Sequence, residues 1–150
     1  MTIFYEDMRV GREFVSDTRS LSQDEILNFA KLTGDLNRLH ISDSYARKTI
    51  FQGRIAHGLF VLAVALGLWF RMDLTRDSLV ALLGIDKVAF RAPVRPGDKL
   101  RLVSKVKSRR LSKSWPEAGI VTLKDSVSGE DGKAVLEFER VLLVKRTAKG

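Results

Sequence analysis

The feature that most restricts the fold of this chain is a run of apolar residues between positions 56 and 70. The stretch from Leu59 to Phe70 has twelve residues and no charge, and from Ala56 onward a helix would have no polar face. Such a helix would be roughly 22 Å long, and other parts of the chain must cover it. The run is too short to span a bilayer, which needs about 20 apolar residues. The segment therefore predicts a central helix that is buried on all sides.

The second half of the chain supplies strands that could cover this helix. The segments with strand-like patterning are Leu79–Phe90, Leu100–Lys107, Val121–Val127 and Val135–Val144. A turn rich in proline and glycine follows the first of them, and Gly129–Gly132 reads as a hairpin turn before the last. A further short strand, weakly patterned, is expected within Arg12–Leu21. Strands joined by short turns predict an antiparallel sheet, so the expected class is α+β.

The residues before the apolar run carry the chemistry. Ser22–Glu25 forms a capping box that begins a helix, and Gly34 suits the left-handed conformation that ends one. Asp35 follows that helix end, and Ser42 can cap a second short helix. We therefore expect His40 to lie in a short, rigid loop of irregular backbone between two helix ends.

Asp35, Asn37 and His40 place a carboxylate, an amide and an imidazole within six residues, and His57 is the second of two histidines. A carboxylate close to an imidazole can take and give a proton near neutral pH, which points to an enzyme. The residues alone also allow a turn aspartate and an ordinary loop histidine. We expect no metal at Asp35, His40 and His57, because their spacing matches no common zinc pattern. The chain has no cysteine, which excludes disulfides and thiolate nucleophiles.

The segment Thr33–His40, followed by Ala56-His57-Gly58 and later by Pro93–Asp98, resembles the MaoC-like dehydratases, a family that includes R-specific enoyl-CoA hydratases. The resemblance extends from about Leu21 to Val144. It implies a hotdog fold, in which a curved antiparallel sheet wraps around a long central helix, and we expect one such domain over residues 1–150. It also implies reversible hydration of a trans-2-enoyl-CoA thioester to a 3-hydroxyacyl-CoA.

The resemblance also implies roles for single residues. Asp35 and His40 would hold the reacting water, one as base and the other as acid, with Asn37 supporting their loop. A backbone N–H at Gly67 would stabilise the enolate oxygen. His57 is expected to close the start of the buried helix by a hydrogen bond. Apart from the resemblance, Arg91 and Arg95 flank the proline-rich turn, where two interpretations are open: ordinary surface charges, or arginines that bind the phosphates of coenzyme A.

Three positions depart from the family pattern. Arg38 stands where the family usually has proline, so the loop lacks a fixed φ angle. Ser42 replaces an aspartate and can still cap a helix. Leu66 replaces a serine found in hydratases of this group, so a polar contact is lost. These changes leave the Asp35–His40 pair intact.

The net charge of +8 is concentrated between Lys99 and Lys113, where no acidic residue occurs. Three interpretations remain open: a solvated sheet face, a nucleic-acid surface, or a field that attracts the phosphates of coenzyme A. Nucleic-acid binding is the less favoured partner, because no aromatic residues alternate with these basic ones. No signal peptide or membrane span is recognisable, so we expect a cytoplasmic protein.

The expected assembly is a homodimer, because a single domain of this size offers little concave volume and the resemblance places the thioester channel near a subunit interface. Trp69 and Phe70 are expected to be core or dimer contacts. Coenzyme A enters only as part of the substrate, and no other cofactor is expected. The alternatives are a thioesterase on the same fold, which would activate water at the carbonyl carbon, and a non-catalytic module that binds a CoA ligand or nucleic acid.

Overall fold

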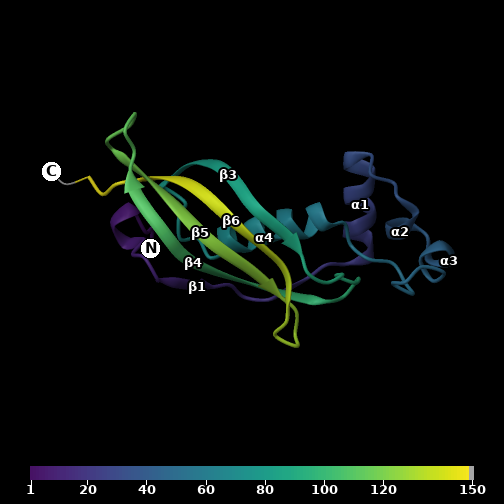
Figure 1. Ribbon diagram of the computed structural model, residues 1–150. Coiled ribbons are helices and arrows are strands. Elements are labelled where there is room, and N and C mark those ends of the chain that lie inside the picture. The colour runs from purple at the N-terminus through teal and green to yellow at the C-terminus, as the bar shows by residue number, and fades with distance from the viewer. Residues whose placement is uncertain (149–150) are drawn as a thin grey trace.

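In the computed structural model, which describes residues 1–148, a curved antiparallel sheet packs against one long helix (Figure 1). The helical elements are η1 (Tyr5–Asp7), α1 (Gln23–Thr33), α2 (Arg38–Ile41), α3 (Asp43–Ala46) and α4 (Gly58–Arg71). The strands are β1 (Glu13–Val15), β2 (Arg19–Ser20), β3 (Leu79–Phe90), β4 (Lys99–Leu111), β5 (Ala118–Ser128) and β6 (Ala134–Lys145). The expected α+β class is confirmed, and α1, α2 and α3 project beyond one end of the sheet.

The order of strands in the sheet is β1-β4-β5-β6-β3, and β2 pairs with β4 beside this path. The long strands agree with the expected segments, and short turns connect β4, β5 and β6. The single short strand expected within 12–21 is instead divided into β1 and β2. Ser16 separates them: its hydroxyl accepts the amide hydrogen of Leu102, so a side chain takes part in the pairing at this point.

Helix α4 is covered by the sheet on one side only, so the expectation of burial on all sides is wrong. Its inward face carries Val61, Val64, Ala65, Leu68 and Trp69, which are buried. Its other face leaves Leu59 at 65% and Phe70 at 52% exposed. A uniformly apolar sequence indicates that both faces avoid water, but the sheet of one chain covers only the inward face. Within residues 1–148, no helix is both long and apolar enough to cross a membrane.

A buried ion pair lies between the sheet and α4. Arg140 on β6 and Asp125 on β5 are each 1% exposed, and the Nε and Nη2 atoms of the arginine donate to the two carboxylate oxygens at 2.7 and 3.1 Å. The hydroxyl of Ser104 donates to the same carboxylate. The guanidinium lies over the Trp69 ring, 4.6 Å from its centroid. This pair therefore links two strands to the indole of α4.

Candidate active site

The local structure around Asp35 follows from the capping signals in the sequence. The Ser22 hydroxyl accepts the Glu25 amide at 3.1 Å, and the Glu25 carboxylate accepts the Ser22 amide at 3.0 Å, so the expected capping box begins α1. Gly34 ends α1 with a φ of +80°, which glycine adopts without steric cost. Asp35 follows directly, on the exposed side of the chain.

His40 does not lie in irregular backbone, as the sequence suggested, but in the one-turn helix α2. Asn37 begins this helix: its side-chain oxygen accepts the Leu39 amide at 3.0 Å. Ser42 then caps α3 by accepting the Tyr45 amide at 3.3 Å, as expected. The three-residue spacing between Asn37 and His40 permits one helical turn, which a search for longer apolar periodicity could not detect.

The tautomer of neutral His40 follows from its hydrogen bond. Its Nδ1 lies 2.8 Å from the carbonyl oxygen of Ile55, and a carbonyl only accepts, so Nδ1 carries a hydrogen. The Nε2 atom is therefore the nitrogen that can exchange a proton with a ligand. The residue is 8% exposed, which keeps its ring in a fixed orientation.

His57 precedes α4 as its N-cap residue, but its side chain makes no capping hydrogen bond, so that expectation is wrong. Instead its Nε2 donates to the backbone carbonyl of Asp35 at 3.0 Å. Its Nδ1 is buried and has no hydrogen-bond partner within residues 1–148. Burial lowers the pKa of His57 below its ordinary value, and this effect exceeds the opposing effect of the hydrogen bond to the Asp35 carbonyl.

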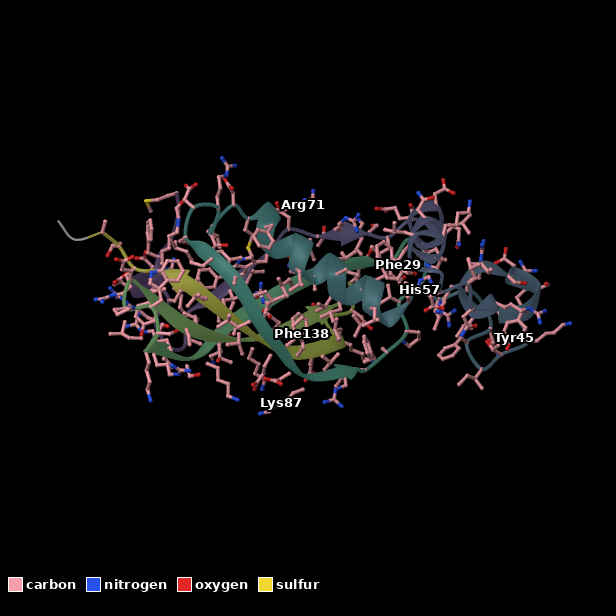
Figure 2. The ribbon with its side chains drawn as sticks, turned by 90° about the horizontal axis from the view of Figure 1, so that it is seen from above. Phe29, Tyr45, His57, Arg71, Lys87 and Phe138 are labelled. Carbon is pink, nitrogen blue, oxygen red and sulfur yellow. The ribbon has the colours of Figure 1, made fainter. Side chains whose placement is uncertain are left out.

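Asp35, His40 and His57 lie together, although the chain separates them by up to 22 residues. Each offers one carboxylate oxygen or ring nitrogen within 4.8 Å of the others. The two imidazole centroids are 3.8 Å apart, and Phe29 packs on His57 with a centroid distance of 4.9 Å. Figure 2 shows Phe29 and His57 at the end of α4 that faces α1. This donor set can hold a water molecule and move its proton, and its atom types could also hold a divalent cation.

The start of α4 adds hydrogen-bond donors to this cluster. The first intrahelical bond runs from the Val61 amide to the His57 carbonyl at 3.1 Å. The amides of Gly58, Leu59 and Phe60 precede it, and within the described residues none of them has a hydrogen-bond partner. The positive end of the helix dipole adds to their attraction for negative charge.

Gly67 does not lie with these groups. It is the tenth residue of α4, about 14 Å along the axis from Gly58. In a helix interior the amide is bonded to the carbonyl four residues earlier, so the Gly67 N–H is not a free donor. The sequence did contain a signal for a free amide donor: Gly58 directly follows His57 and begins the helix.

A pocket of about 390 Å³ adjoins the start of α4. Its lining is mostly apolar and includes Phe51, Gly58, Val61, Phe90 and Val135. A Cβ atom at position 58 would lie 2.7 Å from the Phe90 ring, so any larger residue there would displace this ring. The pocket offers space for an apolar group beside the free amides.

The two arginines near the proline-rich turn differ in position. Arg91 lines this pocket, and its Nη2 lies 3.8 Å from a carboxylate oxygen of Glu137. Arg95 does not line it: its Nη2 donates to the carbonyl of Phe51 at 2.5 Å. Arg95 therefore holds the loop before α4, and Arg91 is the arginine available to a ligand in the pocket.

Two basic residues of β4, Lys107 and Arg109, have partners elsewhere in the fold. Lys107 donates to the Glu139 carboxylate at 2.5 Å, and this contact raises the pKa of Lys107. Arg109 donates to the carbonyl oxygens of Tyr5 and Glu6 at 2.8 and 3.2 Å. The sequence segment has no acidic residue of its own, but the fold brings a carboxylate of β6 and carbonyl oxygens of η1 to these two side chains. These contacts favour the interpretation of a solvated sheet face.

Sequence comparison identifies similar proteins. A family model of the MaoC like domain matches residues 7–128. The protein MaoC of Klebsiella aerogenes is 32% identical over 76% of this chain, and the chain spans about a third, 34%, of that relative's length. A protein of Rhodospirillum rubrum named (R)-specific enoyl-CoA hydratase is 30% identical, with 94% of this chain and 91% of the relative covered.

Solved structures agree with the fold. The crystal structure of a MaoC-like dehydratase from Rhodospirillum rubrum superposes with a TM-score of 0.85 at 27% identity, covering 98% of this chain and 99% of the other. A Mycobacterium tuberculosis protein with a double hotdog fold gives a TM-score of 0.86 at 21% identity, over 99% of this chain and 46% of the other. The hotdog fold implied by the sequence is thereby confirmed.

Proposed function

Because this chain belongs to the MaoC-like domain family, we propose that it catalyses the reversible hydration of a trans-2-enoyl-CoA thioester to a 3-hydroxyacyl-CoA. The observation that carries the proposal is the convergence of three groups at one place. These are the Asp35 carboxylate, the His40 ring and the start of α4, where the amides that follow His57 have no hydrogen-bond partner within residues 1–148. The names of relatives, among them hydratases and dehydratases, support the same reaction class.

The Asp35–His40 pair accounts for the protons of the reaction. Addition of water transfers hydroxide to the β-carbon and a proton to the α-carbon, so one group accepts a proton from water and another donates one. His40 keeps its Nδ1 hydrogen on the Ile55 carbonyl in either charge state, and Nε2 exchanges the reacting proton. The pair needs one exchangeable proton between its two members. The member that holds this proton acts as the acid and the other as the base.

The start of α4 stabilises the enolate that forms along the reaction. When hydroxide adds to the β-carbon, the thioester oxygen gains negative charge, which it keeps until the α-carbon is protonated. Among the residues that the structure describes, the amides of Gly58 and Leu59 have no hydrogen-bond partner, and they belong to the positive end of the helix. Preorganised donors of this kind lower the barrier because they need no rearrangement during the reaction. We assign them the role that the sequence had suggested for Gly67.

The remainder of the substrate fits the surroundings of this cluster. The apolar pocket beside Gly58 and Phe90 would take part of the thioester, and Arg91 at its wall would attract a phosphate of coenzyme A. The assembly proposed is a homodimer. Strand β3 is at the edge of the sheet, and Leu82 and Leu83 on it are 45% and 50% exposed, so a second copy can pair with this edge.

The test is hydration of crotonyl-CoA, followed by the loss of the conjugated thioester absorbance. Asp35→Asn and His40→Ala are each expected to lower the rate by about 10²–10⁴-fold, the usual effect of a lost acid–base group. Such a loss corresponds to about 3–5 kcal/mol in the barrier. Asp24→Asn makes the same isosteric change at an exposed position of α1 and should keep the wild-type rate.

The same assay separates the alternatives. A thioesterase would release free thiol from acyl-CoA, whereas hydration releases none. A binding module would bind acyl-CoA or nucleic acid without turnover of any thioester. The proposed function is wrong if the folded protein hydrates no enoyl-CoA, short or long.

A further inference from the structure

We propose that His57 is a positioning residue that holds the Asp35 backbone and the His40 ring in their reactive arrangement. The inference rests on the proposed function, since it concerns how that pair is oriented. In this role His57 orients the two neighbouring residues by direct contacts and does not itself transfer a proton. Two contacts carry it, and both come from the same imidazole.

The first contact fixes Asp35. This residue is exposed and follows a helix end, where its backbone has few restraints. Its amide donates to the hydroxyl of nearby Thr33 at 3.3 Å, a long and local bond. The bond from His57 Nε2 to the Asp35 carbonyl is 3.0 Å and comes from 22 residues away. Among the hydrogen bonds of Asp35 to described residues, it alone ties this backbone to α4 and therefore to the sheet.

The second contact fixes His40. The two imidazole rings lie 3.8 Å apart between centroids and are tilted by 32°. His57 also packs against Phe29 of α1, with the ring centroids 4.9 Å apart, so it contacts a second ring besides His40. With Nδ1 bonded to Ile55, the His40 ring is held both at one nitrogen and along one face. Figure 2 shows His57 and Phe29 next to each other near the end of α4.

The charge state of His57 suits this role. Burial lowers its pKa below the ordinary value, although the hydrogen bond to the Asp35 carbonyl acts in the opposite direction, and this shift favours the neutral ring. Its hydrogen on Nε2 is fixed by the Asp35 carbonyl. A neutral ring can face a protonated His40 without like-charge repulsion. The same ring would repel it if both were charged.

Three variants of His57 distinguish the effect of its hydrogen-bond donor from the effect of its side-chain volume. In His57→Gln the side-chain amide nitrogen can occupy the place of Nε2 and donate to Asp35. In His57→Asn the amide ends near the place of Nδ1 and falls short. His57→Leu keeps apolar bulk and has no donor. We expect kcat to fall about 10²-fold in the Asn and Leu variants, as for a misplacement of about 1 Å, with KM changed little. The Gln variant should recover most of kcat.

The control is Val64→Ala, a buried position of α4 whose side chain packs on the sheet side. It lowers stability by removing core volume but should keep kcat, which shows that destabilisation alone does not produce the effect. The proposal is overturned if His57→Leu retains kcat within about twofold. It is equally overturned if the Gln variant is as slow as the Asn variant.

Imidazole nitrogen NMR gives a readout that needs no turnover. The chain has only two histidines, so the spectrum is simple to assign. His57 should show the Nε2–H tautomer, and His40 should keep its Nδ1–H signal in the Gln variant and lose its defined signal in the Asn variant. This result would support positioning even if no thioester were hydrated, and only the proposed function would then fail. An Nδ1–H tautomer at His57 contradicts the proposal.

Discussion

At the scale of single residues, a contact of Arg38 replaces the backbone restraint that proline gives at this position in the family pattern. Proline would restrict the backbone before His40, and this chain has arginine there. The Arg38 guanidinium lies over the Tyr45 ring, 4.4 Å from its centroid. A cation–π contact thus links α2 to α3 and restrains the helix that carries His40. The position retains rigidity by a different interaction.

Asn37 is the second restraint on this short helix, and its loss should affect both stability and rate. Asn37→Ala removes the cap at the Leu39 amide, which costs about 1 kcal/mol of unfolding free energy. Because α2 carries His40, kcat should fall while KM changes little. Asn37→Asp keeps an oxygen at this place and should retain most of both. Denaturant unfolding and steady-state kinetics on the three proteins test this, and equal kcat in all of them would contradict it.

His57 also links stability to pH. Its pKa in the folded protein is below the ordinary value of 6.5, so the unfolded chain binds more protons as the pH falls past that value. The free energy of unfolding therefore decreases with falling pH from about 6.5 until the folded-state pKa is passed. Measured between pH 5 and 8, His57→Gln should show a shallower decrease than the wild type. An identical slope would mean that His57 does not resist protonation. The lowered pKa of Glu25 acts in a separate window, below its ordinary 4.5.

At the scale of elements, the packing of α4 on the sheet depends on the buried Asp125–Arg140 pair. Asp125→Ala would leave the Arg140 guanidinium buried and uncompensated beneath Trp69. Breaking a buried pair in this way costs about 3–5 kcal/mol. The double variant Asp125→Leu with Arg140→Met removes both charges and should recover much of the loss. Denaturant unfolding measures all three proteins, and a loss below about 1 kcal/mol in the single variant would show that the pair is unimportant.

Some elements of this fold could be predicted from the sequence, and others could not. Local signals were sufficient where one residue decides the structure, as at the Ser22 capping box and the left-handed Gly34. Strand alternation located β3 to β6, but it did not indicate which charged residues would be buried. It therefore missed Arg140, which is buried because Asp125 on the neighbouring strand neutralises it. That pairing depends on register between strands, which no local pattern contains.

The site was predictable in its residues but not in its geometry. The short spacing from Asp35 to His40 indicated a common cluster, and the structure brings them together with His57. The depth of Gly67 in α4 and the orientation of the His57 ring depend on where the helix begins and what packs on it. Both are tertiary properties. The sequence therefore identified three residues that the fold brings together, but not the contacts of His57 or the distance of Gly67 from them.

At the scale of the whole molecule, the exposed apolar residues lie where a second copy could cover them. Leu59 and Phe70 are exposed on α4, and Leu82, Leu83 and Val88 on the edge strand β3. A long apolar edge that remains open invites pairing with another chain, and a two-fold axis would place the two β3 strands side by side. A stable interface of this kind buries about 1,600 Å² in total.

Leu83→Lys should therefore convert a dimer into a monomer, because it places a charge in the centre of the proposed contact on β3. Val10→Lys introduces the same charge at an exposed apolar residue outside α4 and β3 and should leave the dimer intact. Sedimentation equilibrium at micromolar protein measures both. A wild-type protein that sediments as a monomer would contradict the dimer, as would a Leu83→Lys variant that still dimerises. If the thioester channel lies at that interface, the monomeric variant should also lose crotonyl-CoA hydration while His40 keeps its Nδ1–H tautomer.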